Sequence, residues 1–456
     1  MTNHEKTEKH LEGCEHCRRQ IPFDMPPEII EACKKGKLVV FAGAGISTEG
    51  RGVFPFSFYE EIQNELGISE NLDFPSLMSR YVKKTRDKRL LLNKAKSRID
   101  YSKSFPDLYS NATSFHQELS TIHQIQEIVT TNWDDFFEVE CAATPIVTDE
   151  DFAFWDQPFR KVFKIHGSIN NPGSVIATEE DYRKCYKKLG QSAVGGSLRH
   201  LLATKTIVFV GYSFGDYDFN KIYQYLHKTM GDILPHAYFV TLAEKPPTTL
   251  KEFSPTLLHT DATFFMATLK QKLVEEKQIL PDEIYTLIFK RLMDIRQIHF
   301  PFVGRDIRKD PSVIFCGAYQ DGIIHAFEKI LKNRNTGQYS HICRIESSIK
   351  SYFSLKKAFL SKKKYFDVAY IDGYLLGLFQ MIPELVKKIG FPTYYVFGSP
   401  NQLLSLKDYL KENKRAKKLH KSAYRWAEKI AMKYEKGMVL QHSNFLMGVS
   451  LDDLKD

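Results

Sequence analysis

The stretch LVVFAGAGIST, residues 38–48, limits the folds open to this chain more than any other part of the sequence. Apolar residues that favour strands lead directly into Gly43-Ala44-Gly45, which is typical of a buried strand ending in a tight turn. If a helix follows, its first backbone N–H groups can bind a pyrophosphate. The full GxGxxG fingerprint would need glycine at position 48, where this chain has Thr48. A tight turn that binds nothing is therefore the alternative interpretation.

Short apolar runs alternate with amphipathic stretches over the next two hundred residues. The expected strands are 38–42, 127–131, 162–166, 206–211 and 237–241, and the expected helices are 58–66, 115–124, 182–189 and 219–228. This alternation predicts an α/β fold, a Rossmann-like parallel sheet with helices on both faces. The charged segment 71–110 predicts a helical insertion beside the sheet.

The length of 456 residues predicts more than one domain, because single hydrophobic cores rarely grow so large. We expect a polar N-terminal segment over 1–27, the α/β domain over 28–300 and a helix-rich mixed α/β domain over 301–456, with the Pro-containing stretch 300–311 at the boundary. No apolar run approaches the roughly 18 residues of a membrane helix, and the first thirty residues are polar. Seven scattered cysteines fit a reducing compartment, so we expect a cytoplasmic protein.

The positive charge lies in the C-terminal third. Residues 301–456 hold 27 Lys and Arg against 15 Asp and Glu, a net +12, whereas residues 1–300 hold 37 against 40, a net −3. The run KENKRAKKLHK, residues 411–421, is most simply a solvated helix face, and nucleic acid or another polyanion is the alternative partner. The apolar stretch 365–382 is expected in the core, with an interface as the other reading, and 393–398 could form a strand.

Three further motifs place polar side chains just beyond predicted strands. These are TTNWD at 130–134, KIHGS at 164–168 and FVGYSFGD at 209–216. Open α/β sheets bind their ligands at this edge.

Together with GAGIS, these motifs resemble, in order, the nucleotide-binding motifs of the Sir2 (sirtuin) family. The resemblance covers roughly half of the chain and implies an NAD⁺ site, with NAD⁺ as substrate. It implies that Gly43, Ala44, Gly45 and Ser47 hold the pyrophosphate and nicotinamide side, that Asn132 and Asp134 face the nicotinamide ribose, that His166 is the catalytic base, and that Gly211 and Ser213 line the adenosine ribose and phosphate. Thr131 and Asp216 complete the expected cofactor-binding set.

The residue types suit the cleavage of a nicotinamide–ribose bond. Positive charge develops on the ribose while the leaving group departs neutral, so the site needs a polar group near the sugar and a base for water or a hydroxyl. Asn132 can orient such a group, and the ordinary pKa of histidine lies close enough to neutrality for His166 to accept a proton. Taken alone, His166 would more often be a structural hydrogen-bonding residue.

Departures from the deacylases of this family favour water as the acceptor. Deacylases carry a zinc module with two Cys-x-x-Cys pairs after the catalytic histidine, whereas residues 167–300 contain only Cys185. They also read Gly-Ile-Pro-Asp-Phe-Arg where this chain reads GVFPFS at 52–57, which argues against an acyl-lysine channel. The chain therefore resembles the Sir2-like NAD⁺ hydrolases of prokaryotic antiviral defence, and we expect an abortive-infection effector.

Such an enzyme must be controlled, because it would exhaust the NAD⁺ of its own cell. We expect a homo-oligomer, a partner ATPase or a phage-derived activator to order the site, and no membrane partner. An NAD-dependent deacylase or ADP-ribosyltransferase is the second hypothesis. A silent nucleotide-sensing and nucleic-acid-binding module is the third, although it would need neither Asn132 nor His166.

A separate cluster lies near the N-terminus. His10, Cys14 and Cys17 have the spacing of a His-x₃-Cys-x₂-Cys zinc knuckle, with His4, His16 or Cys33 as a fourth ligand. A flexible tail is the alternative, because no second cysteine pair lies nearby.

Overall fold

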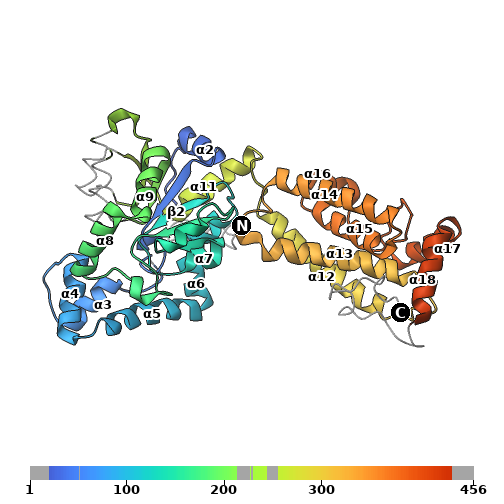
Figure 1. The fold of residues 1–456 in the computed structure, drawn as a ribbon, viewed down its shortest axis with the longest axis horizontal. Coiled ribbons are helices and arrows are strands. Elements are labelled where there is room, and N and C mark those ends of the chain that lie inside the picture. Colours follow the sequence, from blue (N-terminus) through green and yellow to red (C-terminus); the bar gives the residue numbers. More distant parts are fainter. Residues whose placement is uncertain are drawn as a thin grey trace, which may run out of the picture. The chain divides into compact units, whose positions relative to one another are not determined.

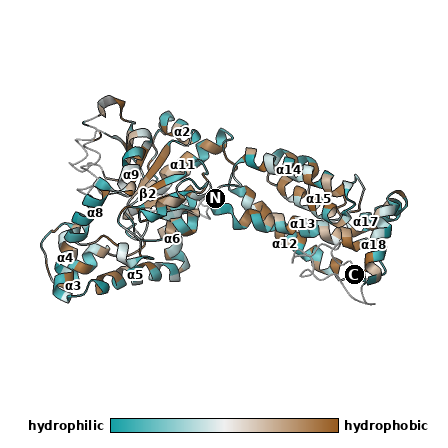
Figure 2. Ribbon diagram, viewed as in Figure 1, coloured by the Kyte–Doolittle hydropathy of each residue, from teal (hydrophilic) through white to brown (hydrophobic). Residues whose placement is uncertain are grey.

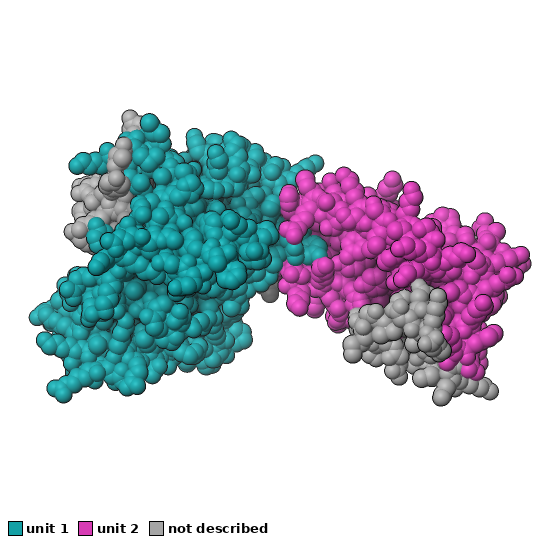
Figure 3. Space-filling view, viewed as in Figure 1, with its two compact units in different colours: residues 1–279, 335–340 teal, residues 280–334, 341–456 magenta. Residues whose placement is uncertain are grey.

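The computed structural model describes residues 20–50, 52–212, 226, 228, 230–243 and 255–433 (Figure 1). The described chain forms two compact units, coloured separately in Figure 3. Unit 1 comprises Met1–Ile279 together with Asn335–Ser340, and unit 2 comprises Leu280–Arg334 and His341–Asp456. Among the described residues, no helix is both long enough and apolar enough to cross a membrane.

A parallel sheet forms the centre of unit 1. Its strands are β1 (Leu38–Ala42), β2 (Glu127–Thr130), β3 (Thr144–Ile146), β4 (Lys161–Lys164), β5 (Thr206–Val210), β6 (Ala237–Thr241) and β7 (Thr256–His259), in the order β3-β4-β2-β1-β5-β6-β7. Every pair is parallel, and the register aligns Ala42 of β1 with Thr130 of β2 and with Val210 of β5. The predicted Rossmann-like sheet is confirmed.

Helices cover both faces of the sheet, as alternating residues of its strands require. Val40 of β1 faces α2 (Pro27–Lys34), α6 (Pro106–Ser120) and α11 (Ala262–Glu275). Phe41 points to the opposite face, against α8 (Glu179–Gln191) and α9 (Ala193–Thr204). The strands are correspondingly hydrophobic and the outer helix faces hydrophilic (Figure 2).

The helical insertion predicted over 71–110 contains α4 (Phe74–Thr85) and α5 (Lys88–Ser104), and together with the preceding helix α3 (Phe58–Leu66) it forms what we call the insertion. It has a core of its own, which includes Ile62, Leu77 and Ile99 and extends to Phe136 in α7 (Phe136–Cys141). Ser57 begins α3 with a capping box, in which Ser57 and Glu60 each bond the backbone N–H of the other. Through the shared core, the insertion packs against the segment that follows β2.

Unit 2 is helical. Its helices are α12 (Glu283–Val303), α13 (Val313–Lys332), α14 (Ile342–Ser361), α15 (Tyr365–Phe379), α16 (Pro383–Ile389), α17 (Leu406–Leu419) and α18 (Lys421–Lys433). The stretch 365–382 contributes α15, which is largely buried. The strand predicted at 393–398 is wrong, because this segment pairs only through an isolated bridge between Tyr394 and Leu403. The helix predicted over 219–228 lies almost wholly outside the described residues.

Candidate active site

A cavity of about 770 Å³ lies at the carboxyl edge of the sheet in unit 1. Residues from the ends of β4, β2, β1, β5, β6 and β7 line it, and the insertion forms the facing wall. Six neighbouring strand ends at about 4.8 Å per strand span about 24 Å. The cavity can therefore accept an extended ligand with several chemical parts.

Close backbone contact explains the glycines after β1. A Cβ atom at Gly43 would lie 2.4 Å from the carbonyl oxygen of Gly211. The N–H of Gly43 donates to Val210 O at 2.9 Å, and that of Gly45 donates to Gly211 O at 3.0 Å. The helix expected next is only a three-residue 3₁₀ turn, Ala44–Ile46, so the prediction of an exposed helix N-terminus is wrong. The neighbouring strand has already taken two of the N–H groups that were expected to bind a ligand.

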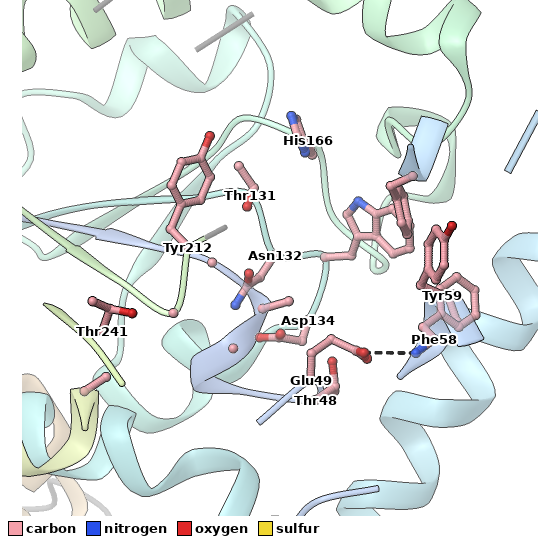
Figure 4. A pocket seen from close by; sticks show the side chains of 18 of the residues that line it. Thr48, Glu49, Phe58, Tyr59, Thr131, Asn132, Asp134, His166, Tyr212 and Thr241 are labelled. Carbon is pink, nitrogen blue, oxygen red and sulfur yellow. Dashed lines mark hydrogen bonds between the residues drawn. The ribbon is translucent and has the colours of Figure 1, made fainter. Parts of the chain in front are cut away.

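A chain of hydrogen bonds beneath the cavity orients Asn132. The Ser47 hydroxyl donates to Asp134 Oδ2 at 2.8 Å, and Asn132 Nδ2 donates to Ser47 Oγ at 3.2 Å. Since the Ser47 hydrogen is given to Asp134, its oxygen must accept, which fixes the Asn132 amide with Nδ2 inward. Asn132 Oδ1 is buried and has no hydrogen-bond partner among the described residues. Asn132 lines the cavity, so its unpaired acceptor is available to a ligand (Figure 4).

Lys164 supplies a buried positive charge under this chain. Its side chain is fully buried, and Nζ donates to the carbonyl oxygen of Asp134 and to Glu138 Oε1, the latter at 2.9 Å. Burial raises the pKa of the Asp134 carboxyl, while the Lys164 charge and the Ser47 hydrogen bond oppose that rise. Lys164 belongs to the predicted motif KIHGS, but no role of its own was predicted for it. A lysine inside a buried strand, two residues before a candidate catalytic histidine, was the available signal.

His166 follows β4 and lines the same cavity (Figure 4). Its ring packs edge-on against Tyr182, with centroids 4.9 Å apart, and only 7% of the residue is exposed. Gly167 turns the chain with a φ of +79°, and a Cβ there would meet Ser174 O at 2.1 Å. The glycine after the histidine is thus required by the turn that directs His166 to the cavity.

The insertion and the segment before it contribute charged and aromatic groups that were not predicted. Glu49 accepts a hydrogen bond from the N–H of Phe58 at 2.9 Å, drawn as the dashed line in Figure 4. Arg98 of α5 places its Nε 3.3 Å from Glu49 Oε1, and its Cζ lies 3.9 Å from the centre of the Phe54 ring. Burial raises the pKa of Glu49, which the Arg98 charge counteracts. Arg98 sits in a generally charged stretch, and no local pattern distinguishes it.

The structure brings most of the predicted site residues to one cavity. Those lining it are Gly43, Ala44, Gly45, Thr131, Asn132, Asp134, His166 and Gly211. Ser47 is fully buried behind the wall and supports Asn132 and Asp134 rather than lining the cavity. Ser213 and Asp216 lie outside the described residues, as do His10, Cys14 and Cys17 of the predicted zinc knuckle. In the described part of the chain, no group of three or more His, Cys, Asp or Glu could hold a metal ion.

A doubly wound parallel sheet with an elongated cavity at its carboxyl edge defines the class of nucleotide-binding α/β domains. Residues 126–263 match the family model of the SIR2-like domain. The chain therefore contains a SIR2-like domain, and the resemblance inferred from its motifs is confirmed. The matched range includes Asn132, His166 and Gly211.

The chain is also similar to curated proteins that are named as a sirtuin or as NAD(+) hydrolases. Defense-associated sirtuin 2 of Bacillus subtilis is 25% identical over 230 residues, which are 48% of this chain and 22% of that protein. NAD(+) hydrolase ThsA of Cytobacillus dafuensis is 28% identical over 213 residues, 45% of this chain and 41% of that protein. ThsA of Bacillus cereus (strain MSX-D12) is 27% identical over 203 residues, which are 42% of this chain and 40% of that protein. The alignments thus cover less than half of each relative.

Proposed function

We propose that this protein is an NAD⁺ glycohydrolase, which cleaves NAD⁺ to nicotinamide and ADP-ribose. The observation that carries this proposal is the buried, unpartnered Oδ1 of Asn132 in a cavity that His166 also lines. A buried hydrogen-bond acceptor without a partner costs free energy unless a ligand or a water molecule donates to it. A ribose hydroxyl or the attacking water would donate this hydrogen bond to Asn132 Oδ1. The SIR2-like match and the two relatives named NAD(+) hydrolase support the same substrate.

The reaction breaks the bond between nicotinamide N1 and C1′ of the ribose. The bonding electron pair leaves with the nicotinamide ring and neutralises its positive charge, so positive charge moves onto the ribose. A water oxygen then bonds to C1′, and the water loses one proton. In this proposal the Asn132 carbonyl dipole holds the ribose or the water, and the neutral imidazole of His166 takes the proton.

We further propose that this activity serves antiviral defence, as the name of the Bacillus subtilis relative suggests for that protein. Control by self-assembly, a partner ATPase or a phage-derived activator would protect the host before infection. Nicotinamide release should then rise more steeply than linearly with protein concentration or on addition of an activator.

The test follows NAD⁺, nicotinamide and ADP-ribose by HPLC over a range of protein concentrations. We expect Asn132→Ala and His166→Ala each to lower nicotinamide release by about 10²–10³-fold, the usual loss for a removed catalytic donor or base. His200→Ala is the matched control, because His200 is an exposed histidine on α9 and does not line the cavity.

Two results would overturn the proposal. Nicotinamide release that needs an acetylated peptide would identify a deacylase. NAD⁺ that remains intact at every protein concentration and after addition of an activator, yet binds with a Kd measurable by calorimetry, would identify a nucleotide sensor.

A further inference from the structure

Helices α17 and α18 carry an unusual excess of positive charge. Residues 406–433 contain ten Lys and Arg against three Asp and Glu, a net +7 with histidine neutral. This is more than half of the +12 carried by the whole C-terminal third. The excess is concentrated in two consecutive helices, so it can act as one surface.

The basic residues lie in rows on the outer sides of both helices. On α17, Lys407, Lys411, Lys414 and Lys418 follow the spacing i, i+4, i+7 and i+11, and all four are exposed. Their Cα atoms extend over about 16 Å along the helix axis. On α18, Lys421, Arg425 and Lys429 form a second exposed row at intervals of four. With the exposed Arg415, these residues make up what we call the α17–α18 basic surface.

The three carboxylates of this segment do not neutralise the surface. Asp408 accepts a hydrogen bond at 2.6 Å from Oγ of Ser405, the N-cap residue of α17, and Glu412 accepts from Ser399 Oγ at 2.9 Å. Glu428 pairs with Lys417, which is not part of the surface, at 2.7 Å. No member of the surface forms an ion pair with a described residue. Like charges at i, i+4 destabilise a helix, so an ordinary solvated face would alternate its signs.

Both helices are held by the core of unit 2 through their opposite sides. Tyr409 is fully buried, and its hydroxyl lies 3.0 Å from Ser312 Oγ. Tyr424 donates to Asn413 Oδ1 at 3.0 Å, which joins α18 to α17. The sides of both helices that carry the buried residues are therefore held by the core, although Leu410 and Leu419 of α17 are exposed, and the basic side chains project from fixed helices. An amphipathic membrane-binding helix would need its apolar face free to enter lipid.

We propose that the α17–α18 basic surface binds nucleic acid through its phosphates, without reading base sequence. Phosphates along a nucleic-acid strand present closely and regularly spaced charges, which two rows of lysine and arginine can contact together. This function is independent of the proposed NAD⁺ hydrolysis, since the surface lies in unit 2 and the cavity in unit 1.

The test measures binding of fluorescently labelled 30-bp duplex DNA and of 30-nucleotide single-stranded DNA and RNA by anisotropy, at 50–200 mM salt. One variant combines Lys411→Gln, Lys414→Gln, Lys418→Gln and Lys421→Gln. The matched control combines Lys350→Gln, Lys357→Gln, Lys387→Gln and Lys388→Gln, which remove the same charge from exposed lysines of α14 and α16. Circular dichroism establishes that both variants are folded.

We expect the full-length protein to bind at least one of the three probes. The α17–α18 variant should raise Kd by about tenfold or more at about 100 mM salt and flatten the slope of log Kd against log salt, while the control stays near wild type. Equal weakening by the two variants would overturn the proposal, because only net charge would then matter. So would the absence of binding to every probe. Repeating the measurement with His166→Ala keeps the result separate from any NAD⁺ turnover.

Discussion

His116 is a histidine that the fold keeps neutral. It is fully buried in α6, where its ring packs edge-on against Phe137 at 4.4 Å and Phe136 at 5.8 Å. Neither ring nitrogen has a hydrogen-bond partner among the described residues. Burial, with a smaller effect of the Lys164 charge, lowers the pKa of His116 to about 3. The site thus tolerates an imidazole but not an imidazolium.

The lowered pKa predicts acid-sensitive folding. Between pH 6.5 and about 3 the unfolded chain binds a proton at His116 and the folded chain does not. The free energy of unfolding is therefore not reduced by His116 above pH 6.5, and it falls as the pH decreases below that value. The loss approaches about 1.4 kcal/mol per pH unit. In His116→Phe, which keeps an aromatic ring of similar size, we expect stability within about 1 kcal/mol of wild type at pH 7.5 and a shallower decline towards pH 5.

Urea unfolding followed by tryptophan fluorescence checks this prediction. In a Trp426→Phe background the signal comes from Trp133 and Trp155, both in unit 1. His200→Gln, which alters an exposed histidine, should leave the pH dependence of the urea midpoint as it is. An unchanged slope in His116→Phe would show that another group causes the acid sensitivity.

At the scale of elements, the loops that follow β1 and β5 are in close backbone contact. Gly43→Ala would place a methyl group 2.4 Å from Gly211 O and 2.8 Å from the Cα of Tyr212, so backbone must move. We expect a loss of about 1–3 kcal/mol in the free energy of unfolding, and weaker nucleotide binding because the same loops line the cavity.

The matched control is Gly196→Ala in α9, where the nearest atom to an added Cβ is the end of the Arg199 side chain at 3.9 Å. That change should be neutral or stabilising by up to about 1 kcal/mol, since alanine favours a helix. Unfolding midpoints and NAD⁺ calorimetry compare the two variants. If Gly43→Ala matched Gly196→Ala in both, the close contact would not constrain the loop.

The elements differ in how far the sequence could predict them. β1, β2, β4, β5 and β6 were found because each is buried on both faces and reads as a short apolar run. β3 and β7 were missed, since these edge strands are short, one contains Pro145 and the other exposes three of its four residues.

The candidate site was predictable on the sheet side and not on the insertion side. Parallel strands bring their carboxyl ends to one edge, so Asn132 and His166 could be placed together from their positions after predicted strands. Arg98 and Glu49 meet only because the insertion packs across the cavity, which no local spacing encodes. The free backbone N–H groups expected after β1 were mispredicted for the same reason, since those of Gly43 and Gly45 bond carbonyl groups at the end of β5, a strand distant in sequence.

At the scale of the whole molecule, unit 1 is completed by a late segment of the chain. Residues 335–340 belong to unit 1, although the chain on both sides belongs to unit 2. Arg160, which is 4% exposed, donates to carbonyl oxygens of Ser120, Ile122, Ile125, Cys141 and Asn335. The Ser340 hydroxyl donates to Thr121 O at 2.5 Å. Unit 1 therefore gains its full set of contacts only when the chain extends to residue 340.

Ser340→Ala should accordingly weaken unit 1 although Ser340 stands between helices of unit 2. The buried hydroxyl bond to Thr121 O would be lost, at a cost of about 1–2 kcal/mol. By hydrogen–deuterium exchange we expect faster exchange at the end of α6 and the start of β2, and unchanged exchange in α17. Ser347→Ala, an exposed serine on α14, is the control and should change neither. Faster exchange confined to α13 and α14 would mean that Ser340 stabilises only the helices beside it, and that unit 1 does not depend on residues beyond its own continuous stretch.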